Sequence, residues 1–293
     1  MGLGIASIQC LLQIYSEKKF KDKKKIFALG SLELHCKKKD LYEIFEQTDL
    51  SVSMLDKFEN LDNYPNQPRC SAKYLWEALG FTEYVSLDTN REHNSIEHDL
   101  NKPFNDRKYF NYFDVVADYG TAEHIFNIPE VYKTLHKILK PGGILILSQG
   151  RLKTNGYFLL DRSFFEGIAA ANNYKILGSN YIVHLRDKTP SGSYKQFRIP
   201  CSNDFFEILD FRLIDSVGIE MVLEKTEDED FKIPYQDDLM KDKYNHLGFN
   251  KIFSHDDMSY SYIPKFNNKI EKFTFKVLLK EFFKRLKNKL FKK

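Results

Sequence analysis

Short apolar runs recur through the first half of the chain, and most of them end near a glycine or an acidic residue. They predict strands over residues 24–31, 82–88, 95–101, 112–118 and 142–148. Segments of helical character, residues 71–80 and 128–139, lie between some of these runs. Strands that are apolar on both faces are typical of a parallel sheet covered by helices on both sides. The pattern therefore predicts an α/β fold in which helices sandwich the sheet.

The rest of the chain continues this pattern and then changes character. We expect an N-terminal helix that packs on the domain, because Ile5, Ile8, Leu12 and Tyr15 fall at helical spacing. A further helix is predicted near residues 162–172, with strands near 175–185 and 217–223. The predicted divisions are a main domain over residues 1–225, a polar excursion or linker over 226–266, and a basic amphipathic helix over 267–293.

Composition excludes some classes of protein. A 42% hydrophobic and 15% aromatic content is that of a folded chain. The net charge of +3 comes from 44 basic and 41 acidic residues, so overall charge does not favour a nucleic-acid binder. The four cysteines are far apart and form no CxxC pair, which favours reduced thiols in a cytoplasmic protein. Because no histidine shows ligand spacing with acids, we expect no metal site.

Polar and small residues follow the predicted strands where open parallel sheets bind ligands, outside their carboxyl ends. These residues are Gly30, Asp88, Asp99, Asp118 and Gly120. An acid at the end of the second strand can accept hydrogen bonds from both hydroxyls of a ribose. Each acid alone also fits an ordinary turn former. Their occurrence at successive strand ends favours a ligand site.

These motifs resemble those of class I S-adenosylmethionine-dependent methyltransferases. FDVVADYGTAEHIFN (residues 113–127) and VYKTLHKILKPGGILIL (131–147) are similar to the family's fourth-strand motif and the segment leading into its fifth strand. EYVSLD (83–88) and EHDLN (97–101) are similar to its second- and third-strand motifs. The pattern also resembles bacterial methyltransferases encoded with surface-polysaccharide genes. The resemblance covers roughly residues 24–223 and implies a Rossmann-like sheet.

The resemblance implies S-adenosylmethionine as the cofactor and S-adenosylhomocysteine as its product. The residues that would bind the cofactor are Gly30 and Ser31 near the methionine part, Asp88 at the ribose, Asp99 and Leu100 at the adenine, and Asp118, Tyr119 and Gly120 where the methyl is transferred. The family's first motif commonly reads acid-x-Gly-x-Gly-x-Gly. This chain has Ala28, Leu32 and Leu34 at the acid position and the last two glycines.

The altered first motif keeps two other classes of function open. One is a catalytically inactive methyltransferase-like subunit that scaffolds a partner. The changed cofactor loop is the reason to consider it. The other is a nicotinamide-dependent enzyme on a similar sheet. The second lacks the glycine-rich fingerprint that holds a pyrophosphate after the first strand. Methyl transfer remains the better interpretation, since S-adenosylmethionine has no pyrophosphate.

The segment after the fourth predicted strand contains the candidate catalytic residues. Methylation of a hydroxyl requires a group that removes its proton, and His124 can do so near neutral pH. Glu123 can orient the imidazole or bind a substrate hydroxyl, although both residues also fit a role in pinning the loop. Arg151 and Asn155, after the fifth strand, are candidate acceptor-binding residues. The subgroup resemblance implies a small-molecule or glycan acceptor, with methylation on an oxygen of a sugar or sugar-linked group in surface-glycan biosynthesis.

The last residues of the chain are strongly basic. From Lys265 to Lys293 there are 11 lysines and arginines and 2 acids, and apolar residues recur at helical spacing. Such a helix suits an anionic membrane surface or a membrane-bound partner. We therefore expect a cytoplasmic protein at the inner face of a membrane. A helix that docks on its own or a partner subunit is the alternative, and nucleic acid is the poorer fit because the apolar stripe needs burial.

Overall fold

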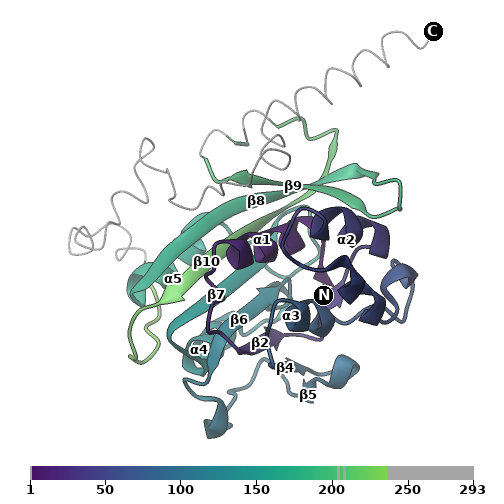
Figure 1. Cartoon of the computed structure of the whole chain (residues 1–293). Helices are drawn as coiled ribbons and strands as arrows, with labels where there is room; N and C mark the ends of the chain where they lie inside the picture. Colours follow the sequence, from purple (N-terminus) through teal and green to yellow (C-terminus); the bar gives the residue numbers. More distant parts are fainter. Residues whose placement is uncertain (1, 203–204, 207–208, 236–293) are drawn as a thin grey trace.

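The computed structural model describes residues 2–202, 205–206 and 209–235. Within these residues, eight strands form one sheet in the order β5-β4-β2-β6-β7-β10-β8-β9 (Figure 1). The strands are β2 (Lys25–Leu29), β4 (Glu83–Asp88), β5 (Ile96–Glu97), β6 (Phe113–Tyr119), β7 (Leu139–Leu152), β8 (Tyr174–Lys188), β9 (Tyr194–Pro200) and β10 (Ile214–Lys225). The first five strands in this order, β5, β4, β2, β6 and β7, are parallel to one another. Strand β10 is antiparallel to both β7 and β8. The predicted α/β sheet is confirmed.

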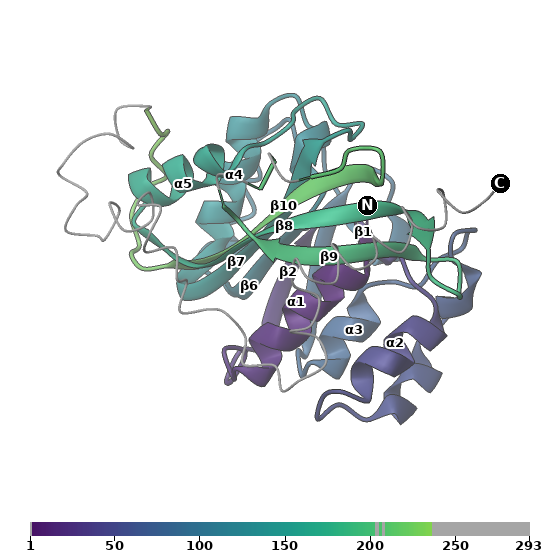
Figure 2. The same cartoon turned by 90° about the horizontal axis from the view of Figure 1, so that it is seen from above.

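Helices cover both faces of the sheet. One face carries α1 (Ile5–Ser16), α2 (Lys38–Phe45) and α3 (Lys73–Ala78), and the opposite face carries α4 (Ile128–Ile138) and α5 (Arg162–Ala171) (Figure 2). Short 3₁₀ helices span Val52–Lys57, Leu61–Asn63, Glu92–Asn94, Arg107–Tyr109 and Ala122–His124. Each face has its own apolar core. Strands β2 and β6 contribute alternate residues to the two cores, which is why they are apolar throughout.

Several predicted strands differ in length from those observed, and within the parallel part of the sheet two of them, β5 and β7, differ most. The predicted strand over 95–101 is reduced to Ile96–Glu97, because the chain turns at Asp99. The Asp99 carboxylate accepts a hydrogen bond from the Asn101 N–H, and its carbonyl accepts one from the Lys102 N–H. These local bonds compete with the strand ladder. Strand β7 in turn begins at Leu139, before the Pro-Gly-Gly segment, and pairs there with β6 across an irregularity.

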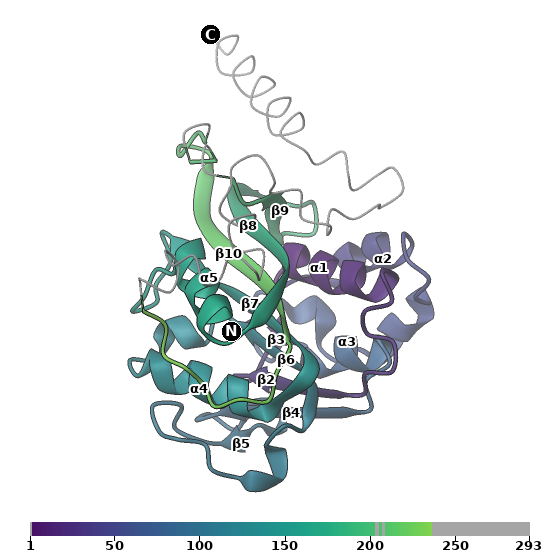
Figure 3. The same cartoon turned by 90° about the vertical axis from the view of Figure 1, so that its left-hand side faces the viewer.

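The β8–β9 hairpin extends the sheet beyond β10, and β9 was not predicted from the sequence. It lies beside α1 (Figure 3). The turn of the hairpin is tied to α2, because Ser191 and Ser193 donate hydrogen bonds to the Asp40 carboxylate. On the same side, strand β1 (Gly2–Leu3) pairs in parallel with β3 (Glu33–Leu34). The N-terminal segment and the hairpin therefore meet above the carboxyl ends of the central strands.

The chain after β10 returns along α4 and α5 as far as residue 235. His136 Nε2 lies 2.7 Å from the Glu229 carbonyl oxygen, and the Lys232 N–H donates to Asn172 Oδ1 at 2.7 Å. The rest of the predicted excursion and the basic helix over 267–293 lie outside the described residues, so the three predicted divisions of the chain stay predictions. Within the described part of the chain, no helix is long and apolar enough to cross a membrane.

Candidate functional site

The Asp-Tyr-Gly-Thr segment at the carboxyl end of β6 forms a tight turn that is held by several hydrogen bonds. Gly120 has a φ of 76°, a conformation that side chains disfavour, and its N–H donates to the Ser148 carbonyl at 2.8 Å. The Asp118 carboxylate accepts a hydrogen bond from the Thr121 N–H at 2.9 Å. Thr121 Oγ1 donates to the Leu29 carbonyl at 2.8 Å. The turn therefore joins three neighbouring strands and sets the direction of the short helix Ala122–His124.

Glu123 is held in the buried part of this short helix. Only 5% of the residue is exposed, and its carboxylate accepts a hydrogen bond from the Gly150 N–H. Its own N–H donates to Gln149 Oε1 at 3.1 Å. Burial raises the pKa of Glu123, and the Gly150 hydrogen bond opposes that shift. The ring of His124 is more exposed, and its Nε2 lies 3.7 Å from Glu123 Oε1. The structure thus brings the two predicted catalytic residues together, with their roles still predictions.

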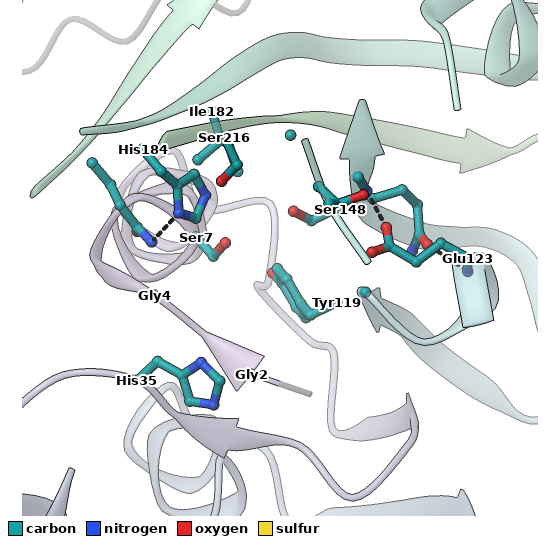
Figure 4. A pocket seen from close by; sticks show the side chains of 16 residues that line it. Gly2, Gly4, Ser7, His35, Tyr119, Glu123, Ser148, Ile182, His184 and Ser216 are labelled. Carbon is teal, nitrogen blue, oxygen red and sulfur yellow. Dashed lines mark hydrogen bonds between the residues drawn. The ribbon is translucent and has the colours of Figure 1, made fainter. Parts of the chain in front are cut away.

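A cavity of about 170 Å³ lies beside Glu123, at the carboxyl ends of β6 and β7 (Figure 4). Its walls come from seven separate segments of the sequence. They consist of Gly2, Gly4, Ser7, His35, Tyr119, Gly120, Glu123, Ser148, Gln149, Gly150, Thr154, Ile182, His184, Gln196, Ser216 and Gly218. Most of the side chains carry hydroxyl, amide, imidazole or carboxyl groups. The cavity therefore suits a polar ligand rich in hydrogen-bonding groups.

The glycines of the N-terminal segment allow its close approach to the cavity. A β-carbon added at Gly2 would overlap the His35 ring, and one added at Gly4 would overlap the Gln196 amide. Gln196 Oε1 also accepts a hydrogen bond from the Ala6 N–H at 2.9 Å. The start of the chain is thus packed against β9 and the loop after β2, and it closes one side of the cavity.

The predicted ribose-binding acid is already hydrogen-bonded within the protein. Asp88 is 8% exposed, and its Oδ2 accepts hydrogen bonds from the Ser31 N–H at 2.8 Å and the Ser31 hydroxyl at 2.9 Å. Its Oδ1 accepts from the N–H groups of Thr89 and Asn90 at 2.7 and 3.3 Å. Burial raises the pKa of Asp88, but these hydrogen bonds outweigh burial and leave it below the usual range. The carboxylate is therefore ionised and lies directly beside the first-strand loop.

The leucines that replace glycines in the first motif do not enter the ligand region. Leu32 and Leu34 are fully buried in the core shared with α1 and α3. Gly30 keeps a left-handed conformation, with φ of 82°. A β-carbon added at Gly120 would meet open space. The turn thus leaves open space at Gly120, whereas Asp88 Oδ2 is bonded to Ser31, and cofactor binding by these residues stays a prediction.

The remaining predicted cofactor residues occupy different environments. Asp99 is partly exposed and stabilises its own turn, whereas Leu100 is 7% exposed and packs in the core on the α4 face. Asn101, in the same turn, bonds to Asn127 at the start of α4. Asp118 is fully buried, and burial raises its pKa to about 7. Tyr119 lines the cavity, and its hydroxyl has no hydrogen-bond partner among the described residues.

The two predicted acceptor-binding residues lie outside the lining of this cavity. The guanidinium of Arg151 is 2.5 Å from an Asp161 carboxylate oxygen and faces the ring of Phe206 at 4.9 Å. Asn155 is exposed in the loop after β7. Their predicted role is not tested by this arrangement. The neighbouring Thr154 does reach the cavity, where it contacts Gly150.

None of the four cysteines lines the cavity. Cys10, Cys36, Cys70 and Cys201 are free and buried, and burial raises the pKa of all four thiols. In residues 2–202, 205–206 and 209–235, no three His, Cys, Asp or Glu side chains gather in a group that could hold a metal ion.

Sequence reasoning missed the wall of the cavity that is formed by β8, β9 and the N-terminus. His184, Gln196 and Ser216 lie on three adjacent strands, and residue pairing places them side by side. A weak signal exists in β8, where the histidine at 184 alternates with apolar residues at 183 and 185. Nothing in the sequence pairs Gln196 with Gly4, because 192 positions separate them and the contact depends on tertiary packing.

Part of the chain is similar to known proteins. A family model described as a methyltransferase domain matches residues 72–147. No curated protein matches the chain. Among solved structures, a SAM-dependent methyltransferase from Archaeoglobus fulgidus is 12% identical, with 74% of this chain and 93% of that chain covered and a TM-score of 0.41. TehB from Haemophilus influenzae is 11% identical, with coverages of 73% and 62% and a TM-score of 0.40.

The matched domain spans α3 to β7 and includes Asp88, Asp118, Glu123 and His124. The strand order, with one antiparallel strand between β7 and β8, is that of a Rossmann-like class I methyltransferase sheet. The predictions of fold class and of S-adenosylmethionine as the cofactor are confirmed. The family match supports methyltransferase as the class of the segment 72–147.

Proposed function

We propose that the protein transfers a methyl group to a hydroxyl oxygen of a sugar, or of a sugar-linked group, in the assembly of a surface glycan such as capsule or lipopolysaccharide. The polar lining of the cavity beside Glu123 is the observation that carries the proposal. A sugar presents several hydroxyls in a small volume, and the cavity offers hydroxyl, amide and imidazole groups to pair with them.

S-adenosylmethionine supplies a methyl group on a positively charged sulfur. The protein must align the acceptor hydroxyl and take its proton as the oxygen–methyl bond forms. In this proposal the Glu123–His124 pair accepts that proton, with Glu123 facing the cavity and His124 on its outer side. The Gly150 N–H fixes the Glu123 carboxylate, so the group is aligned before the acceptor arrives.

Transfer of labelled methyl groups to nucleotide sugars and glycan precursors tests the proposal. We expect turnover with a member of this set, S-adenosylhomocysteine as the second product, and a large loss in Glu123→Gln. Comparison with His124→Asn shows which of the two residues accepts the proton. Asn155→Ala tests separately the predicted acceptor-binding role of this exposed residue, which lies outside the cavity lining. Methylation confined to other acceptor classes would contradict the proposal.

A scaffold subunit without turnover is the second candidate function. It is favoured by one observation, the hydrogen bonds from Ser31, Thr89 and Asn90 that fill the Asp88 carboxylate. Calorimetric titration with S-adenosylhomocysteine separates the candidates. Binding that is lost in Asp88→Ala supports the enzyme, whereas a folded protein that binds no cofactor supports the scaffold.

A further inference from the structure

Three residues form a row across β10, β8 and β9, the strands that extend the sheet beyond β7. Ser216 of β10 is paired with His184 of β8, and His184 is paired with Gln196 of β9. Directly paired residues on adjacent strands place their side chains on the same face, about 5 Å apart. All three line the cavity, on the wall formed by the sheet extension (Figure 4).

The hydrogen bonds of Gln196 determine which nitrogen of His184 carries the proton. Gln196 Oε1 accepts from the Ala6 N–H, so the amide nitrogen must face the other way. That nitrogen lies 3.3 Å from His184 Nδ1. An amide NH₂ group only donates, so Nδ1 must be an unprotonated acceptor. The proton of the neutral ring is therefore on Nε2, the only ring nitrogen left without a hydrogen bond among the described residues.

The surroundings of His184 keep the ring neutral. Burial lowers the pKa of His184 to about 4, and Lys188, together with His35 when that ring is protonated, acts in the same direction. Asp215 opposes the shift but is exposed at the edge of β10. A neutral ring that has a bonded Nδ1 and a free Nε2–H can donate a hydrogen bond but cannot accept a proton through Nε2.

We propose that His184 Nε2–H binds an uncharged oxygen of the methyl acceptor, with Gln196 as the residue that sets its tautomer. This role rests on the proposed function and makes His184 a specificity-determining residue for that reaction. A hydroxyl, ring or carbonyl oxygen of a sugar supplies the required acceptor. The proton of the reacting hydroxyl passes to the Glu123–His124 pair, and His184 orients the sugar from the opposite wall.

The first test reads the tautomer and needs no acceptor. In the full-length protein with S-adenosylhomocysteine, the ring ¹⁵N shifts of His184 should show the Nε2–H form across the neutral pH range. Gln196→Glu replaces the amide donor with a carboxylate that accepts from Nδ1–H, so the ring should change to the Nδ1–H form or become charged. Gly4→Ala should weaken the same preference by displacing the Gln196 amide. An Nδ1–H or charged ring in the unaltered protein would overturn the proposal.

The second test uses methyl glycosides of common hexoses and N-acetylhexosamines. A glycoside that binds should shift the His184 Nε2–H resonance, and its affinity should fall about tenfold or more in His184→Phe. His184→Gln retains a donor near the position of Nε2 and should restore part of the affinity, while S-adenosylhomocysteine binding stays unchanged in both variants. Glycoside methylation that is insensitive to His184→Phe would refute the role of His184 alone. Failure of every glycoside to bind would refute the sugar acceptor itself.

Discussion

Asp118 should make the protein less stable as the pH rises, and Asp118→Asn should remove this dependence. The carboxyl is fully buried within the turn that carries Glu123, and burial raises its pKa from the ordinary value of 3.8 to about 7. The folded protein therefore retains a proton that the unfolded chain has released above about pH 4. The stabilisation is complete below pH 4 and is lost as the pH rises towards 7.

The size of the effect follows from the shift in pKa. One pKa unit corresponds to about 1.4 kcal/mol, so a shift of about three units amounts to roughly 4 kcal/mol over the whole range. Between about pH 5 and pH 8, where denaturation experiments are practical, the expected loss is about 3 kcal/mol. An asparagine is nearly isosteric, and its Oδ1 can still accept the hydrogen bond from the Thr121 N–H.

Urea denaturation of both proteins at several pH values measures this difference. The free energy of unfolding of Asp118→Asn relative to the unaltered protein should increase by about 3 kcal/mol from pH 5 to pH 8. Glu123 also has a raised pKa, but it titrates in both proteins and largely cancels in the comparison. Parallel stability profiles for the two proteins would refute the reasoning, because they would mean that Asp118 is ionised in the folded state at pH 5.

Three further predictions concern the cofactor, the base and the basic C-terminus. Ser31→Ala should bind S-adenosylhomocysteine up to about tenfold more tightly by calorimetry, because it frees an acceptor position on Asp88. Ser86→Ala, a change at a buried serine on the same strand as Asp88, should leave this affinity unchanged. The methyl-transfer rate should rise with pH through the raised pKa of Glu123, and Glu123→Gln should abolish this rise and lower turnover by roughly 10²–10⁴; an unchanged pH profile would contradict it. Removal of residues 265–293 should reduce binding to anionic lipid vesicles in a sedimentation assay without changing cofactor affinity, and equal vesicle binding would exclude the membrane role.

The central sheet could be predicted because its pattern is local. Each strand is a short apolar run, and glycines or acids such as Gly30 and Asp88 mark where the strands end. The direction of each acid side chain could not be predicted in the same way. Asp118 and Asp99 both follow or end strand segments, yet each bonds to backbone N–H groups of its own turn. An acid at the end of a strand can either bind a ligand or stabilise its own turn. Only the path of the next three residues decides between these two roles.

The acceptor side of the site could not be predicted because its contacts cross long distances in the sequence. Gln196 bonds to Ala6 from 190 positions away. Its strand, YKQFRIP, shows no clear alternation of polar and apolar residues. The strand forms because β8 offers an unpaired edge, and its register then selects which residues face the cavity. Local propensity carries no information about that register.

The division of the cavity walls suggests how this fold separates chemistry from acceptor choice. Tyr119 ends β6, and Gly120 and Glu123 follow it, within the segment that matches the methyltransferase domain. The opposite wall, with His184 and Gln196, comes from strands outside that segment. A change of register in β9 would replace Gln196 at the cavity while leaving the turn after β6 intact. In the proposed function, changes in the added strands would alter acceptor binding, while the turn after β6 would keep the groups predicted to position the methyl donor and remove the proton.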